Sequence, residues 1–184
     1  MCQVVYLTSR LFDVPSKKFK KALAAELRER NIEVVTKNAY SAKRFICRNH
    51  IYGIVIAIDF FRDNGCGCGL TLNQQCSFIS RDFAYNVSNA LDNLMPRIRW
   101  RDFQFVDNKD KTWKLFFNKI HSETKAIFYL CTYNNPFEYN TFMIRFDEIV
   151  KAFADEIVRC LRSNYNVKDY QKRVRMAKLR LKSK

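Results

Sequence analysis

Histidine is scarce in this chain of 184 residues, and its two histidines do not form a catalytic pattern. His50 and His121 both precede expected strands and lie far apart in the sequence. They cannot be assigned to a Ser-His-Asp or Cys-His triad, which is recognised by geometry rather than by sequence position. Two histidines can act as acid and base when a 2′-hydroxyl attacks an RNA phosphodiester, but ordinary surface histidines explain the sequence more simply.

Long apolar runs are also missing. No run approaches the roughly 18 residues that a membrane-spanning helix needs. Residues 1–12 lack a basic region followed by a long apolar segment. The sequence therefore predicts no membrane partner and no secretion signal.

Cysteine shows neither a paired zinc-binding spacing nor a disulfide framework. The seven cysteines are odd in number, and Cys131 and Cys160 lie inside apolar patterns, as reduced core residues do. Cys66 and Cys68, with Cys76 beyond them, lack the paired CxxC spacing of a zinc site. We expect a cytosolic chain with no metal and no cofactor.

Acidic residues are too few to balance the basic ones. The chain has 33 Lys and Arg against 18 Asp and Glu, a net charge of +15. This surplus favours a polyanionic partner, because each neutralised phosphate releases condensed counterions. Nucleic acid or a ribonucleoprotein fits best, although an anionic membrane surface or cell wall would satisfy the same charge.

Hydrophobic residues make up 48% of the chain, so it can bury a core. We divide it into an α/β domain at 1–163 and a basic C-terminal helix or tail at 164–184. The tail holds eight Lys and Arg against Asp169 alone, a net +7. Two interpretations stand: a solvated terminus, or an arm that becomes ordered on a phosphate backbone.

Apolar patterns predict alternating strands and helices. Residues 51–61 are apolar almost throughout, which indicates a central strand covered on both faces. The expected strands lie at 4–7, 32–36, 51–61, 70–72, 97–106 and 126–132, and the expected helices at 13–31, 41–48, 80–96, 111–120 and 146–161. This order predicts a single three-layer α/β domain with a mostly parallel sheet of about five strands.

Open α/β sheets bind ligands beyond the carboxyl ends of their strands, where loops and helix N-termini converge. This rule makes Asp59 the sharpest candidate, because an acid directly after a buried strand needs a cation, a hydrogen-bond donor or a proton. The alternative is that Asp59 pairs with Arg10 or Arg62 for structural reasons. The candidate catalytic residues are Ser9, Asp59, Tyr133 and Glu138.

Basic and aromatic residues alternate over 97–101, a pattern that suits phosphates and stacked bases. Aromatic residues at this density are also common core material, so this interpretation stays open. The candidate RNA-binding residues are Arg10, Arg62, Arg97, Arg99, Trp100, Arg101, Lys172, Arg173, Arg175, Lys178 and Arg180.

Residues 124–161 resemble the closing segment of zinc-dependent N-acetylmuramoyl-L-alanine amidases. That segment has an apolar strand carrying a zinc-ligand glutamate, a turn with Asn-Pro, and an amphipathic helix. The strand, Asn135-Pro136 and the helix are present here, but the place of the glutamate falls near Tyr129 or Leu130. The family's two histidines would fall near Ser9 and at Asp59. The resemblance implies an amidase-like fold and argues against zinc hydrolysis, which needs about three protein ligands.

As a whole, the chain also resembles type II anti-CRISPR proteins of the larger, basic kind. The resemblance lies in a compact, strongly basic chain without a signal peptide or a metabolic motif. It implies that the partner is a CRISPR effector nuclease with guide RNA in the host cytoplasm. The protein would mask the guide, compete for the target channel or promote guide cleavage as a partner-dependent ribonuclease. The alternatives are a divergent N-acetylmuramoyl-L-alanine amidase and a noncatalytic nucleic-acid-binding protein.

Overall fold

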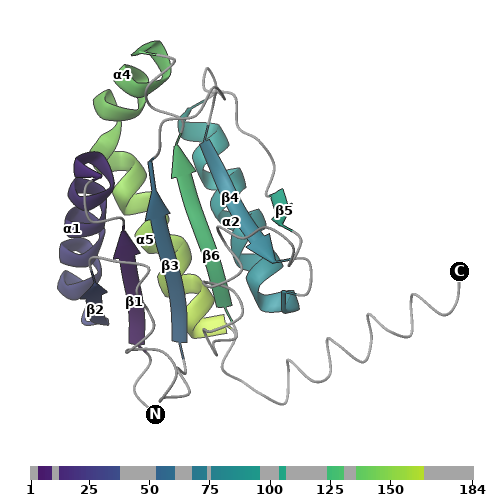
Figure 1. Cartoon of the computed structure of the whole chain (residues 1–184). Coiled ribbons are helices and arrows are strands. Elements are labelled where there is room, and N and C mark those ends of the chain that lie inside the picture. The colour runs from purple at the N-terminus through teal and green to yellow at the C-terminus, as the bar shows by residue number, and fades with distance from the viewer. Residues whose placement is uncertain are drawn as a thin grey trace, which may run out of the picture.

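The computed structural model describes residues 4–9, 13–37, 53–60, 68–73, 76–95, 104–106, 124–130 and 136–163. In this part of the chain, six strands form one sheet in the order β2-β1-β3-β6-β4-β5 (Figure 1). The strands are β1 Val4–Ser9, β2 Glu33–Lys37, β3 Gly53–Asp59, β4 Cys68–Asn73, β5 Gln104–Val106 and β6 Thr124–Leu130. Strands β2, β1, β3 and β6 are parallel, whereas β4 runs antiparallel to β6. The predicted α/β domain with a mostly parallel sheet is confirmed.

Three of the described helices pack side by side on one face of the sheet. Helix α5 (Phe146–Ser163) lies between α1 (Val14–Glu29) and α2 (Phe78–Leu94), and all three lie behind the strands in Figure 1. They form one of the two outer layers expected of a three-layer domain. The expected helices at 41–48 and 111–120, the strand residues 97–103 and the tail 164–184 lie outside the described residues.

Phenylalanine rings fill the space between these helices and the sheet. The ring of Phe19 on α1 lies 5.2 Å from Phe128 of β6, centroid to centroid, and 5.9 Å from Phe153 of α5. It also lies 5.7 Å from Phe60 and 5.9 Å from Phe142. Tilted and edge-on ring contacts of this kind add to the area that each ring buries. Phe19 therefore packs α1 against the sheet and against two further helices, the one that carries Phe142 and the one that carries Phe153.

The central strand β3 is buried on both faces, as its sequence predicts. Ile54, Ile56 and Ile58 belong to the core under the helices, while Val55 and Ala57 alternate to the other face and are also buried. Among the described residues, no helix is long and apolar enough to cross a membrane.

Two expectations about element boundaries were wrong. The helix expected to begin at residue 80 is instead capped by Ser77, whose hydroxyl accepts a hydrogen bond from the Ser80 N–H at 3.2 Å. The sequence predicts a turn at Asn135-Pro136 and no helix before residue 146, whereas the structure has a short helix α4 (Pro136–Ile144) before α5. Proline at its first position fits, since the amide hydrogen that proline lacks has no partner there.

Candidate functional site

Parallel strands β1, β3 and β6 all end at one edge of the sheet, which we call the carboxyl edge. It lies uppermost in Figure 1, beside α4 and the start of α1. Ser9 is the last residue of β1 and Asp59 the last of β3, and both side chains are fully buried. The structure therefore places two predicted catalytic residues at the same edge.

These two side chains nevertheless lie on opposite faces of the sheet. Ser9 is the register partner of Ile58, which faces the helices. Asp59 follows Ile58 and so faces away from the helices, since successive strand residues alternate. The Ser9 hydroxyl, on the helix side, has no hydrogen-bond partner among the described residues. Ser9 and Asp59 thus cannot act on one ligand as a pair.

The position of Asp59 is set by a link between β3 and α1. The Asp13 carboxylate accepts hydrogen bonds from the Ser16 N–H, at 3.0 Å, and from the Ser16 hydroxyl. The Phe60 N–H, directly after Asp59, donates to Asp13 Oδ2 at 2.9 Å and to Ser16 Oγ at 2.7 Å. Asp13 is therefore both the cap of α1 and a clamp on the end of β3. The sequence indicates the cap, but nothing in it indicates the clamp.

Glu138 is a second buried carboxyl group at the carboxyl edge. It lies in the first turn of α4 and is 5% exposed. Phe142, one turn later on the same side of α4, has its ring centroid 5.5 Å from that of Phe60. Glu138 therefore faces inward from a helix that packs on the residue next to Asp59.

The remaining candidates cannot be placed. Tyr133 lies outside the described residues, as do His50 and His121. So do all the predicted RNA-binding residues, namely Arg10, Arg62, Arg97, Arg99, Trp100, Arg101, Lys172, Arg173, Arg175, Lys178 and Arg180. Their roles stay predictions.

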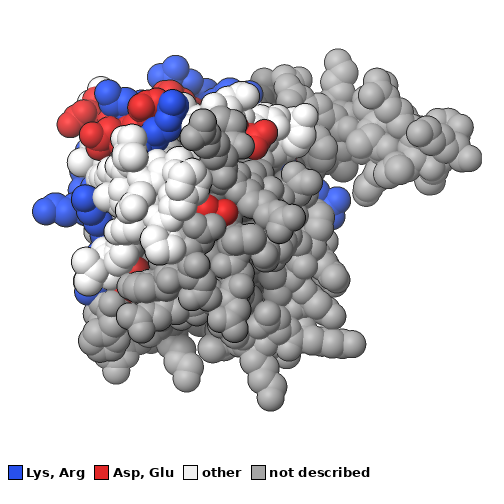
Figure 2. All heavy atoms as spheres, turned by 90° about the horizontal axis from the view of Figure 1, so that it is seen from above, with Lys and Arg blue, Asp and Glu red and all other residues white. Residues whose placement is uncertain are grey.

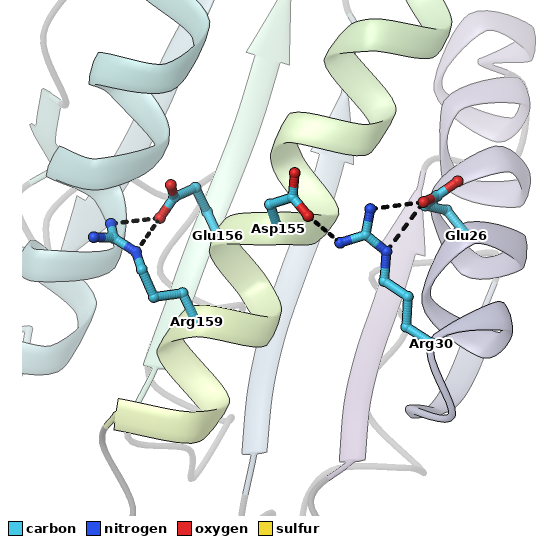
Figure 3. Close-up of polar contacts among 5 residues, drawn as sticks. All are labelled: Glu26, Arg30, Asp155, Glu156 and Arg159. Atoms are coloured by element: carbon cyan, nitrogen blue, oxygen red, sulfur yellow. Dashed lines mark hydrogen bonds and ion pairs between the residues drawn. The ribbon is translucent and has the colours of Figure 1, made fainter.

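Three arginines in the described part of the chain, which we call the framework, form ion pairs with acids. Arg30 at the end of α1 bonds Glu26 at 2.7 Å and also pairs with Asp155 of α5, and Arg159 pairs with Glu156 at 2.5 Å (Figure 3). Burial opposes the charge of Arg30, but its hydrogen bonds to Glu26 and Asp155 outweigh this and raise its pKa. These contacts connect α1 to α5.

Counting by residue shows how unevenly the charge is distributed. The framework holds 13 of the 33 Lys and Arg and 12 of the 18 Asp and Glu, a net +1. The other segments hold the remaining 20 basic and 6 acidic residues, a net +14. The surplus that favours a polyanionic partner therefore belongs almost wholly to segments outside the framework.

A shallow hollow of about 420 Å³ lies on the second half of α5, remote from the carboxyl edge. It is lined by Asp155, Val158, Arg159 and Arg162. Since Asp155 and Arg159 are already paired, this hollow offers no group of unused charges for a ligand.

The fold is that of N-acetylmuramoyl-L-alanine amidases. The chain is similar to the N-acetylmuramoyl-L-alanine amidase of Clostridium difficile 630, with 13% identity and a TM-score of 0.58 over 88% of this chain and 96% of that one. It is also similar to the amidase AmiC2 of Nostoc punctiforme, with 15% identity and a TM-score of 0.53 over 87% of this chain and 97% of that one. No protein-family model and no curated protein matches the sequence. The likeness is thus one of fold over nearly the whole length of both chains.

The zinc-dependent amidases hold their zinc with two histidines and a glutamate. The residues at the positions where these ligands would fall in this chain do not suit a zinc ion. Ser9, Asp59 and Tyr129 stand near those places, and of these only Asp59 is a zinc ligand of the usual kind. Among the described residues, no three His, Cys, Asp or Glu side chains form a group that could hold a metal ion. An open catalytic zinc site needs about three protein ligands, so we derive no step through zinc.

Proposed function

We propose that this protein is a divergent amidase that acts on the muramoyl-alanine amide bond of the cell wall. The supporting observation is the match in fold to two N-acetylmuramoyl-L-alanine amidases over nearly the full length of each chain. The match covers nearly the whole sheet-and-helix scaffold and not only a few strands. Ligands of open α/β sheets bind at the carboxyl edge.

The chemistry rests on one carboxyl group. Asp59 takes the proton of a water molecule that attacks the amide carbon and then gives this proton to the departing amine of alanine. The bond between the lactyl carbonyl and this nitrogen then breaks, and water supplies both the new hydroxyl group and the balance of protons. General acid and base groups of this kind contribute about 10²–10⁴-fold each.

The row of residues beside Asp59 in the sheet includes a glycine. Asp59 is the register partner of Tyr129, which in turn pairs with Gly69 of β4. Glycine in a strand permits another backbone or a ligand to approach closely. Because Asp59 is fully buried in the chain without ligand, the substrate must displace the atoms that cover it.

Hydrolysis can be tested with one variant and one matched control. We expect Asp59→Asn to lower the rate of release of free stem peptide from a muramoyl-peptide by about 10²–10⁴-fold. Glu148→Gln, which changes an exposed acid on α5, is the control and leaves the rate unchanged. Equal rates for the two variants would refute the role of Asp59.

A second function is favoured by the uneven charge. The 20 basic residues outside the framework, against 6 acidic ones, suit a polyanion such as the guide RNA of a CRISPR effector nuclease. In this version the protein is an anti-CRISPR inhibitor built on an amidase fold. Incubation with the effector and labelled guide RNA, followed by a denaturing gel and a target-cleavage assay, tests it. Inhibition with an intact guide means masking, a shortened guide means nuclease activity, and unchanged target cleavage removes this function.

A further inference from the structure

Three large apolar side chains are exposed at the end of the molecule that carries α4 and the start of α1. Val14 is 71% exposed, Phe137 56% and Ile144 83%. Phe137 and Ile144 are seven residues apart on α4, so they lie on the same side of that helix. Single exposed apolar residues are common, but three at one end of a small domain form a surface that a partner can cover.

One contact places the start of α1 beside the junction of α4 and α5. Lys18, one turn after Val14, places its Nζ over the Phe146 ring, 5.1 Å from the centroid. Phe146 is the first residue of α5 and comes two residues after Ile144, the last residue of α4. We call Val14, Lys18, Phe137 and Ile144 the apolar-basic surface.

Cations outnumber anions among the residues of 13–21 and 136–151 that are not buried. These cations are Lys17, Lys18, Lys21, Arg145 and Lys151, and the acids are Asp13, Asp147 and Glu148. Figure 2 looks onto this end and shows uncharged atoms over much of the described area, with a few red Asp and Glu atoms among them, blue Lys and Arg atoms at its margin, and a mixed group of red and blue atoms beside it. Of these acids, Asp13 is engaged in the α1 cap and Glu148 is paired with Arg145 at 3.4 Å.

We infer that the apolar-basic surface docks on an anionic lipid surface. A bilayer with anionic headgroups offers both negative charge for the lysines and an apolar interior for Val14, Phe137 and Ile144. A nucleic acid offers the charge but no apolar groove for branched aliphatic side chains. A second copy of this chain carries the same excess of positive charge and is repelled. The inference departs from the expectation of no membrane partner, which rested only on the lack of a spanning segment, and it does not depend on the proposed hydrolysis.

Vesicle sedimentation of the full chain at two salt concentrations tests this inference. At low salt, we expect the basic residues outside the framework to hold the protein on vesicles that contain phosphatidylglycerol, whether or not the apolar-basic surface inserts. At about 1 M salt the Debye length falls to about 3 Å, so the binding that remains reports apolar insertion. We expect the unaltered protein to stay bound at this salt, and the double variant Val14→Ser with Ile144→Ser to lose at least about tenfold in affinity.

Tyr85→Ser is the matched control, because Tyr85 is also exposed, at 57%, but lies on α2. It should bind as the unaltered protein does, and circular dichroism should show that all variants fold. Release of the unaltered protein at about 1 M salt would overturn the inference, because adsorption would then be electrostatic only. Equal binding by the double variant and the unaltered protein at that salt would overturn it as well.

Discussion

The framework and the segments outside it differ sharply in charge: the framework is nearly neutral at net +1, while the other segments carry net +14. Within the framework, Arg30, Arg145 and Arg159 pair with acids, and one of these pairs, Arg159 with Glu156, lies within α5 itself. The described sheet and helices are therefore nearly neutral by themselves. The comparison teaches that most of the net charge lies in segments other than these strands and helices.

The largest loss of stability should come from a substitution that removes core packing in the framework without changing its charge. Phe19→Ala removes a ring that lies within 6 Å of Phe60, Phe128 and Phe153. We expect it to lower the free energy of unfolding by about 3–5 kcal/mol, measured by urea denaturation. Phe137→Ala, on an exposed face of α4, should change it by about 0.5 kcal/mol or less. Similar losses for both variants would mean that Phe19 does not join the layers.

Removing residues 164–184 should weaken binding to nucleic acid and leave the stability of the fold nearly unchanged. The change removes eight basic residues and Asp169 and leaves the framework sequence intact. We expect affinity for an RNA oligonucleotide to fall by about tenfold or more, and the slope of log K against log salt to become shallower. The free energy of unfolding should change by about 0.5 kcal/mol or less. An unchanged slope would show that the tail is not the binding arm.

A smaller effect should follow from releasing the end of β3. Asp13→Ala removes the α1 cap and one of the two acceptors of the Phe60 N–H, so the unfolding free energy should fall by about 1–2 kcal/mol. Ser77→Ala, which removes only the cap of α2, is the matched control. Thermal and urea unfolding should show a larger loss for Asp13→Ala. If Ser77→Ala lowers the free energy of unfolding by as much as Asp13→Ala does, the hydrogen bond from Phe60 to Asp13 does not contribute to stability.

The smallest effect concerns a buried cation inside the framework. Lys20 is 5% exposed and donates from Nζ to the Lys37 carbonyl at 2.6 Å, and burial together with Lys17 lowers its pKa. Between the lowered pKa and the value of about 10.4 in the unfolded chain, the unfolded state binds more protons. The free energy of unfolding should therefore rise with pH in this window, relative to Lys20→Met. Lys21→Met, an exposed control, should follow the unaltered protein. Parallel curves for all three proteins would contradict the shift.

Much of the framework can be predicted from local pattern. The unbroken apolar run before Asp59 identifies β3 as a central strand, and Asp13 with Pro15 marks the start of α1. Both signals lie within a few residues of the feature that they predict. Burial of β3 on both faces follows from the same run, because a half-exposed strand would alternate.

Features of the site that depend on residues far apart could not be predicted. The bond from Phe60 to Asp13 spans 47 residues, and the Arg30–Asp155 pair spans 125. The sequence places Ser9 and Asp59 at strand ends, but which face each occupies depends on register, since a shift of one residue reverses it. Pro136 is compatible with a turn as well as with a helix start, so α4 was missed.

The most direct test is chromatographic detection of free stem peptide after the full-length protein is incubated with a muramoyl-peptide. We predict that the unaltered protein releases the peptide and that Asp59→Asn releases it at least about 100-fold more slowly. No release by the unaltered protein would contradict the proposed amidase function, and the match to amidases would then concern the fold alone.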